Sequence, residues 1–250
     1  MNAREYNKNA YDEMASRYQE KRNDPERSGW NNCLEVPAME SILKPISQGK
    51  LTLDLGCGTG ILTEKLMAWK ALPVGVDHST EMIKLARQNI PQIEFRIGSA
   101  EALPYPNDHF DLVASSLMMH YIKDLLPVFG EVSRVLKPDA DFVFSMHHPF
   151  HESFKIEKER SHGKPVLQPY FHNDEYHWEM CGTRLISFHH TFESIVKALT
   201  ACGFVLKDLI ECKPAEDTRE HFEAYEFASK YPSFCVFHAV KTEGASPLRS

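Results

Sequence analysis

The chain has 250 residues, of which 42% are hydrophobic and 25% charged, a composition typical of a soluble globular protein with one sizeable core. The formal net charge of -7 at pH 7, without a basic stripe, argues against a nucleic-acid partner. No apolar run is long enough to span a bilayer, and the first residues lack a signal-peptide core, so we expect a cytoplasmic, single-domain protein. The 6 cysteines are scattered without a CxxC pair, which favours reduced thiols.

Two helices are expected ahead of the first strand. Residues 4–22 place apolar and aromatic side chains on one face at i, i+4 spacing, which predicts a helix. A second helix is expected over about 32–43, with Pro37 as a local irregularity, and Pro45 is expected to end it. These N-terminal helices, within residues 1–45, are expected to belong to the same domain as the rest of residues 1–250.

A glycine-rich turn follows the first predicted strand. The leucines of 51–55 indicate a short buried strand, and helical spacing resumes at 61–68. Between them, Gly56, Gly58 and Gly60 allow a tight turn and let a ligand approach the backbone. The helix after the turn presents free N–H groups to that ligand.

Strands and helices alternate up to about residue 146, which implies parallel strands joined by right-handed crossovers. Ser79 or Thr80 is expected to cap one helix and Asp124 another. In chain order, the predicted segments are a strand at 74–77, a helix to about 89, strands at 93–97 and 110–115, a helix that Pro138 stops, and a strand at 142–146.

Residues 147–190 break this alternation. The segment is rich in His, aromatic and charged residues and is too long for a plain connection, so we expect a cap-like insertion after the fifth strand. The alternation then returns with a helix at 191–201 and strands at 204–210 and 233–240, followed by a frayed tail at 242–250.

The glycine turn, an acidic residue and a short polar segment lie at the carboxyl ends of three successive strands, where open α/β sheets bind ligands. Asp77 ends the second strand about 20 residues after the glycine turn, where nucleotide sheets of this kind bind a ribose diol. Gly98-Ser-Ala-Glu101 follows the third strand. The glycine spacing differs from the dinucleotide fingerprint GxGxxG. The structural alternatives are a plain tight turn for the glycines and a helix N-cap for Asp77.

Together these motifs resemble the class I S-adenosylmethionine-dependent methyltransferases, and most closely their small-molecule branch, which includes quinone and sterol methyltransferases. The resemblance covers roughly residues 10–147. It implies a seven-stranded, doubly wound, mostly parallel sheet of the Rossmann-like methyltransferase type, with an antiparallel last strand and a cofactor site along the strand ends. It rests on Leu53-Asp-Leu-Gly-Cys-Gly-Thr-Gly60, Gly75-Val-Asp-His-Ser79, Gly98-Ser-Ala-Glu-Ala-Leu-Pro104, Phe110-Asp-Leu-Val113 and Glu131-Val-Ser-Arg-Val-Leu-Lys-Pro138.

The resemblance also implies roles for single residues in binding S-adenosylmethionine. Asp54 would help to bind its amino end, and Asp77 would accept both ribose hydroxyls. Ser99, where the family often has Asp, would edge the adenine beside Ala100. The family usually has Gly-Gly at 139–140, where this chain has Asp-Ala. The expected cofactor-binding residues are Tyr11, Tyr18, Asp54, Gly56, Cys57, Gly58, Gly60, Asp77, His78, Ser99, Ala100, Glu101 and Ser115.

Methyl transfer from a sulfonium is an in-line displacement, which needs a dry pocket and a positioned acceptor but no enzyme nucleophile. His120, after the fourth strand, is the best candidate for a base or an acceptor-orienting group, and a packing or capping role is its alternative. His147, His148 and Trp178 are expected on the acceptor side. The His-rich insertion lacks metal-ligand spacing, so no metal is expected.

The sequence therefore predicts an S-adenosylmethionine-dependent methyltransferase acting on a small molecule. A catalytically silent S-adenosylmethionine-binding regulatory module is the main alternative. A dinucleotide-dependent oxidoreductase fits less well, because it needs the GxGxxG fingerprint. Methylation of nucleic acid or protein amides is disfavoured, since Ser115-Ser-Leu-Met stands where an Asn/Asp-Pro-Pro-Tyr motif is needed.

Overall fold

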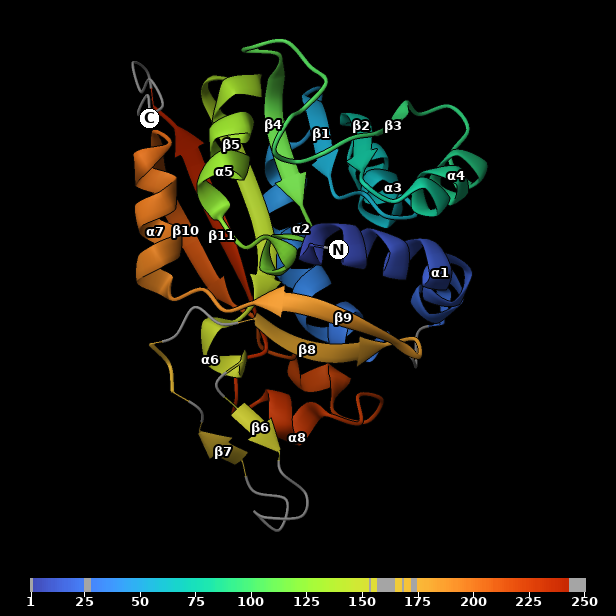
Figure 1. Cartoon of the computed structure of the whole chain (residues 1–250), viewed down its shortest axis with the longest axis vertical. Helices are drawn as coiled ribbons and strands as arrows, with labels where there is room; N and C mark the ends of the chain where they lie inside the picture. The colour runs from blue at the N-terminus through green and yellow to red at the C-terminus, as the bar shows by residue number, and fades with distance from the viewer. Residues whose placement is uncertain are drawn as a thin grey trace.

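A central β-sheet with helices on both faces forms the body of the computed structural model (Figure 1). The structure describes residues 2–24, 28–152, 154–156, 165–167, 169–171 and 175–242, with backbone alone within 151–168. The helices are α1 (Ala3–Asn23), α2 (Val36–Ile46), α3 (Ile61–Ala68), α4 (Thr80–Asn89), α5 (Leu125–Val135), α6 (Pro149–Glu152), α7 (Phe192–Ala201) and α8 (Tyr225–Ala228), with a π-helix η1 (Asn31–Glu35) and 3₁₀-helices η2 (Met119–Tyr121) and η3 (Glu216–Thr218). The strands are β1 (Leu51–Leu55), β2 (Leu72–Asp77), β3 (Phe95–Ile97), β4 (Phe110–Ser115), β5 (Leu136–His147), β6 (Phe154–Ile156), β7 (Pro165–Leu167), β8 (Glu175–Met180), β9 (Thr183–Phe188), β10 (Phe204–Glu211) and β11 (Phe234–Lys241).

The main sheet has seven strands in the order β10-β11-β5-β4-β1-β2-β3. β1 runs parallel to β2 and β4, and β3 and β5 continue the parallel arrangement on either side. β11 runs antiparallel to both β5 and β10. The predicted doubly wound, mostly parallel sheet with an antiparallel last strand is confirmed. Its parallel strands place their carboxyl ends along one edge, so the loops that follow them meet there.

The two faces of the sheet carry separate apolar layers. Val113 of β4 packs with α5 and α7, whereas its neighbours Leu112 and Ala114 pack with α2 and α3. This division follows from the period-two alternation of side chains along a strand. A parallel sheet that is covered on both faces needs such continuous apolar strands, which are the strands the sequence indicates.

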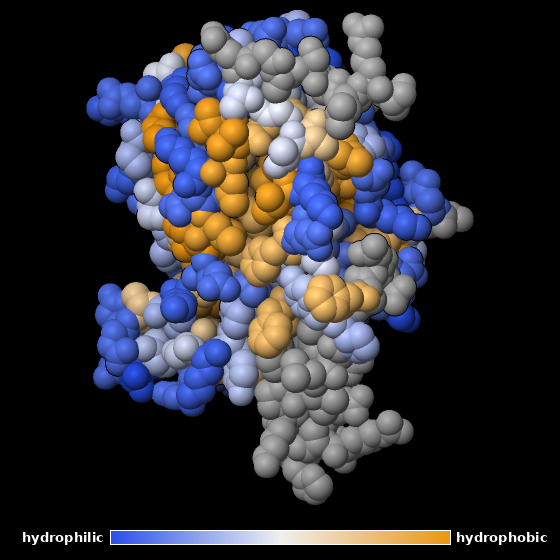
Figure 2. All heavy atoms as spheres, turned by 90° about the vertical axis from the view of Figure 1, so that its left-hand side faces the viewer, coloured by the Kyte–Doolittle hydropathy of each residue, from blue (hydrophilic) through white to orange (hydrophobic). Residues whose placement is uncertain are grey.

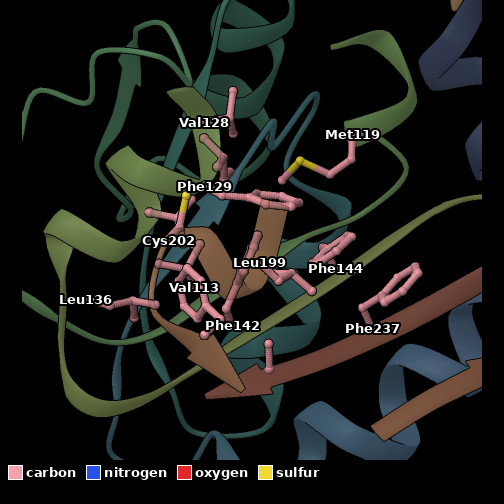
Figure 3. Packing of buried hydrophobic residues seen from close by; sticks show 14 of the residues in the cluster. Val113, Met119, Val128, Phe129, Leu136, Phe142, Phe144, Leu199, Cys202 and Phe237 are labelled. Carbon is pink, nitrogen blue, oxygen red and sulfur yellow. The ribbon is translucent and has the colours of Figure 1, made fainter. Parts of the chain in front are cut away.

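Several phenylalanine rings contact one another in the layer beneath α5 and α7 (Figure 3). The Phe129 ring of α5 lies 5.6 Å from Phe142 and 5.4 Å from Phe144 of β5, measured between ring centroids. Phe144 also stacks on Phe237 of β11 at 4.9 Å. Burial of each such side chain contributes about 1.5–3 kcal/mol. β5 is therefore held firmly, and with it His147 at its carboxyl end.

Two boundaries that were predicted from prolines are wrong, and the strand expected at 93–97 begins only at Phe95. α2 continues past Pro45 to Ile46, because a proline in the last turn removes only one hydrogen bond from the helix. β5 begins at Leu136, and Pro138, expected to stop a helix, lies within the strand. Here the pairing with β4 shifts register, and Asp139 adopts a φ of 58°, in the left-handed region that Asp tolerates.

The C-terminal part of the predicted insertion is an antiparallel hairpin of β8 and β9. Its turn residues Cys181 and Gly182 both have positive φ, 52° and 72°, as a tight two-residue hairpin turn requires. Leu185 of β9 packs against Ala10 and Met14 of α1. The hairpin therefore joins α1 in covering the carboxyl edge of the main sheet (Figure 1). Most of 157–174, and the tail from 243 to 250, lie outside the described residues.

Figure 2 shows the side of the molecule on which α7 and the edge strand β10 lie, where apolar side chains appear among charged ones. Val205 and Leu209 of β10 are 56% and 37% exposed. Charged Lys207, Asp208 and Glu211 alternate with them along the strand. Charges on an edge strand discourage pairing with other chains, which fits the position of β10 at the end of the sheet. Among the described residues, no helix combines the length and apolarity that crossing a bilayer requires.

Candidate active site

A cavity of about 390 Å³ lies at the carboxyl edge of the parallel strands. Residues of the loops after β1, β2, β3 and β4 line it, together with residues of α1, of β8 and of the start of β11. A volume of this size is within the range of about 300–1,000 Å³ that is usual for small-molecule sites. Its lining includes Tyr11, Tyr18, Lys21, Arg22, Gly56, Gly58, Asp77, His78, Ser99, Ala100, Glu101, Ser116, Met118, His120, Tyr121, His147, Trp178, Ser233 and Phe234.

Helix α1 is fixed over the cavity by polar contacts at both sides. The Asn7 side chain donates to the backbone oxygen of Ile186 at 2.7 Å and accepts from its N–H at 3.0 Å. On the other side, Asp12 accepts hydrogen bonds from Ser79 Oγ at 2.6 Å and from the Glu81 N–H at 3.1 Å. α1 therefore bridges the hairpin and the start of α4, and this places its tyrosines in the cavity wall.

The glycine turn brings bare backbone to the cavity. Gly56 and Gly58 adopt φ values of 74° and 53°, which side chains rarely allow. A Cβ on Gly56 would lie 2.6 Å from Met118 Cγ, whereas a Cβ on Gly58 would meet no described residue within 4 Å. The space beside Gly58 is therefore open to a ligand. Gly60 instead packs towards Ile90, outside the cavity wall.

Asp77 is fixed by the glycine turn and by the start of α4. Its Oδ2 accepts from the Gly58 N–H at 2.9 Å, and its Oδ1 accepts from the Ser79 N–H at 2.8 Å. Burial raises the pKa of this carboxyl, and the two N–H groups oppose that rise. A carboxylate has about four lone-pair sites, so two remain for the hydroxyl groups of a ligand. Beside it, burial lowers the pKa of His78, which favours a neutral imidazole.

The loop after β3 forms the next part of the wall. Ser99 Oγ accepts from the Glu101 N–H at 3.2 Å, which turns the hydroxyl back towards its own loop. Glu101 also pairs with Arg4 of α1 at 2.7 Å, so this loop and α1 are joined directly. Gly98 and Ala100 also line the cavity, so one residue without a side chain and one with only a methyl group face it here.

Two groups of opposite charge lie unpaired near the glycine turn. Asp54 Oδ2 accepts from Thr63 Oγ1 at 2.6 Å, but its Oδ1 is buried and finds no hydrogen-bond partner in the described part of the chain. Arg22 Nε and Nη1 are likewise buried without a partner among those residues. Arg22 lines both the main cavity and the smaller pocket beside it that Asp54 lines. An α-amino acid zwitterion carries the two charges that would satisfy this pair.

Asp54 makes the stability of the cofactor-free protein depend on pH. Burial raises the pKa of this carboxyl to about 7 from a usual 3.8, with the negative charge of Asp77 adding to the rise. The folded protein then binds more protons than the unfolded chain between these values, so the free energy of unfolding falls as pH rises from about 4 to about 7. Over this pH range we expect the free energy of unfolding of the wild type to fall by an amount on the order of 3 kcal/mol because of Asp54. Asp54→Asn, which cannot titrate, should not show this fall. Urea unfolding at pH 5 and pH 7.5 measures the change, and an unaltered pH dependence in the variant would contradict it.

Aromatic rings form the other end of the cavity. The imidazole of His120 stacks on that of His147, with centroids 3.8 Å apart and planes 6° apart. The Trp178 ring lies 5.1 Å from His147, and the Tyr121 ring is parallel to Trp178 within 11°. His147 Nδ1 bonds to the Tyr176 hydroxyl at 2.8 Å. The structure thus brings together three of the residues predicted for the acceptor side, from β5, β8 and the segment after β4.

His148, the fourth residue predicted for the acceptor side, points away from the cavity. Its Nε2 bonds to Glu211 Oε1 at 2.9 Å, and its Nδ1 accepts from the Phe150 N–H at 3.0 Å, so it is not part of the cavity wall. Ser115 is also outside the wall, since its hydroxyl donates to the Leu55 oxygen within the sheet. Cys57 lines only the smaller pocket and is otherwise packed against the residues of α4 and β3.

Several wall residues are not among the predicted ones. Arg22 lies on the same face of α1 as Tyr11 and Tyr18, so helical spacing could have identified it. Ser233 and Phe234 reach the cavity because β11 pairs with β5, and nothing in their local sequence marks them. Within the described segments, no group of three or more His, Cys, Asp or Glu side chains is placed to hold a metal ion.

Comparison with known proteins agrees with this geometry. Residues 53–144 match the methyltransferase domain family. The chain is 27% identical to an S-adenosylmethionine-dependent methyltransferase from Mesorhizobium loti of known crystal structure, covering 83% of this chain and 97% of that one with a TM-score of 0.71. An uncharacterized protein of Haemophilus influenzae is 26% identical over 95% of this chain and 97% of its own length. The 2-phytyl-1,4-naphtoquinone methyltransferase of Synechococcus elongatus is 32% identical over 41% of this chain and 48% of its own length, so this chain spans only about half of that relative.

The fold and these relatives are of the class I S-adenosylmethionine-dependent methyltransferase type. The domain match over residues 53–144 and the structural neighbours imply S-adenosylmethionine as the cofactor. The chain's own residues fit the cofactor, because the unpaired charges of Asp54 and Arg22 and the fixed carboxylate of Asp77 match the amino-acid and ribose parts of the molecule.

Proposed function

We propose that the protein transfers the methyl group of S-adenosylmethionine to a small-molecule acceptor by in-line displacement (EC 2.1.1.-). The observation that carries the proposal is that one continuous cavity is lined both by Asp77 and the glycine turn and by the aromatic group around His120. A donor held at one end and an acceptor at the other are brought into line, which supplies much of the catalysis in a displacement reaction.

The cofactor would be held by residues of β1, β2 and α1. Asp77 accepts hydrogen bonds from the ribose hydroxyls through its two remaining lone-pair sites. Asp54 pairs with the amino group and Arg22 with the carboxylate of the methionine part, as their unpaired buried atoms favour. The backbone of Gly98 and Ala100 edges the adenine. When bound, S-adenosylmethionine supplies an electrophilic methyl group on a positively charged sulfur.

The acceptor would be small and flat. His120, Tyr121, His147 and Trp178 surround its end of the cavity with rings, and α1 and the hairpin shield it from water. Aromatic walls favour a ring of comparable width through stacking and burial of apolar area. The Synechococcus relative is named for a naphtoquinone substrate, which supports an acceptor of this kind.

A methyl-transfer assay tests the proposal. The protein is incubated with S-adenosylmethionine labelled in its methyl group and with a small-molecule extract of cells, and labelled products are separated from the cofactor. We expect label in a small molecule and release of S-adenosylhomocysteine in equal amount, and neither with Asp77→Asn. Tight binding of S-adenosylmethionine without any transfer would favour the catalytically silent regulatory module instead.

A further inference from the structure

Two buried polar groups of the acceptor end have no partner within the described residues. His120 is 1% exposed, and neither of its ring nitrogens has a hydrogen-bond partner in the part of the chain that the structure describes. Ser233 is 2% exposed, and its hydroxyl is equally unpaired. Both residues line the cavity. An unpaired buried polar group costs about 1–3 kcal/mol, so a ligand that bonds to these groups recovers that cost.

The surroundings of His120 favour its neutral form. Burial lowers its pKa well below the usual value, and the nearby imidazoles of His147 and His190 lower it further. The ring centroid of Tyr121 lies 4.2 Å from that of His120. Burial raises the pKa of the Tyr121 hydroxyl, so this side chain is uncharged at neutral pH. A neutral imidazole offers one N–H donor and one acceptor nitrogen. The unprotonated nitrogen of His120 is therefore available to accept a hydrogen bond from a ligand hydroxyl and to orient it.

The same surroundings select among acceptor groups. An anionic acceptor would lose its water shell among uncharged rings such as those of Tyr121 and Trp178, and only the sulfonium of the cofactor would offset that cost at this end of the cavity. An alkyl amine would enter as a cation beside the positively charged sulfur of the cofactor, where like charges repel. A neutral hydroxyl on an aromatic ring avoids both costs, stacks on the walls, and brings a proton that can be removed.

We propose, on the basis of the proposed function, that the acceptor is a planar aromatic alcohol whose hydroxyl oxygen is methylated, with His120 as the catalytic residue that takes its proton. The hydroxyl donates to the unprotonated nitrogen of His120, and its oxygen attacks the methyl carbon. The carbon–sulfur bond breaks with its electron pair going to sulfur, a carbon–oxygen bond forms, and the proton goes to His120. The products are an aryl methyl ether, neutral S-adenosylhomocysteine and a His120 imidazolium, which returns its proton to water after release.

The charge balance favours this step. The positive charge leaves the sulfur as it arrives at His120, so the total charge within the buried site does not change. The imidazolium is disfavoured while the sulfonium is present and becomes easier to form once the sulfur is neutral. The stacked His147 holds the ring of His120 in place. The Phe234 ring lies 5.8 Å from that of His147, and the hydroxyl of the adjacent Ser233 can bond to a second polar group of the acceptor.

The atom that receives the methyl group provides the first test. Mass spectrometry of the labelled products from the extract is expected to show aryl methyl ethers. In a matched series, 1-naphthol is expected to be methylated in preference to 1-naphthylamine and 1-naphthoate. Label on nitrogen, carbon or a carboxylate would overturn the inference while leaving the proposed function intact. Absence of label in every product would contradict the proposed function itself.

Variants test the role of His120. His120→Gln keeps a hydrogen-bonding side chain but is not a base, so we expect kcat to fall about 10²- to 10⁴-fold. Affinity for S-adenosylmethionine, which also reports correct folding, is expected to stay within about threefold. The deficit should shrink for ring-substituted 1-naphthols of lower hydroxyl pKa, which a purely structural role of His120 does not predict. Ser233→Ala is expected to raise KM with little effect on kcat. If His120→Gln binds the cofactor and turns over at the wild-type rate, His120 is not the base.

Discussion

Replacement of Asp77 by Asn is expected to lower the affinity for S-adenosylmethionine by about 100-fold or more, while the fold is retained. Asp77 offers the ribose two charged hydrogen bonds, and a hydrogen bond to a charged group contributes about 1.5–3 kcal/mol. The amide keeps one oxygen, which can still accept from the Gly58 or Ser79 N–H, so the glycine turn and the start of α4 lose less than they would with Ala. Calorimetric titration with S-adenosylmethionine measures the loss.

The control variant is Asp139→Asn, which makes the same chemical change outside the cavity wall and keeps a residue type that tolerates a φ of 58°. It is expected to bind S-adenosylmethionine as the wild type does. Asp77→Ala should also lower the thermal midpoint, since it leaves two N–H groups of the turn without their acceptor. Equal affinities of wild type and Asp77→Asn would show that the ribose is bound by other residues.

The parts of the fold that were predicted correctly depend on local chemistry. Ser79 or Thr80 was expected to cap one helix and Asp124 another, and the side chains of Ser79 and Asp124 do accept from an N–H two or three residues further on. Thr191, the first residue of the helix expected at 191–201, caps that helix in the same way. The strand at 110–115 is correct because an apolar run lies between clear turn residues. In each case the interacting groups lie within one turn of the chain, so the sequence shows both partners.

Features created by distant contacts could not be predicted in the same way. The π-helix at Asn31–Glu35 buries Glu35, which accepts from Ser116 and Ser145 of other segments. Within that cluster burial raises the pKa of Glu35, which no local pattern indicates. β5 begins at Leu136 because it finds Phe110 of β4 as a partner across a register shift. These features depend on which segments the fold brings side by side.

The same distinction applies to the site. The glycine turn and Asp77 follow a motif in which spacing and chemistry are both local, and the structure places Gly56, Gly58 and Asp77 around one cavity. His147 and His148 are neighbours in sequence, yet one stacks on His120 and the other bonds to Glu211. The direction of each ring depends on where β5 ends and on what packs beside it. The sequence could identify the pair of histidines but not choose between them.

Replacement of Arg22 by Met is expected to lower the affinity for S-adenosylmethionine by about 10- to 100-fold. The guanidinium is buried with Nε and Nη1 unpaired in the described part of the chain, and it lines both the cavity and the pocket of Asp54. If it binds the methionine carboxylate, the variant loses a charge-assisted hydrogen bond of about 1.5–3 kcal/mol. Methionine keeps most of the apolar stem of arginine, so the packing around the end of α1 is largely retained.

A cofactor analogue without the carboxylate makes this prediction specific. Decarboxylated S-adenosylmethionine keeps the sulfonium, the ribose and the amine, so Arg22→Met and wild type should bind it with equal affinity. Lys21→Met removes a neighbouring positive charge of the same cavity wall and is expected to change the affinity for S-adenosylmethionine less than about threefold, since a partly solvated charge acts weakly at a distance. A loss for the analogue as large as that for S-adenosylmethionine would mean that Arg22 supports the shape of the site and does not contact the carboxylate. Equal losses of affinity in Lys21→Met and Arg22→Met would instead indicate a general electrostatic effect of α1. Adjacent residues on a helix point in different directions, so a contact made by Arg22 alone should not be lost when Lys21 is replaced.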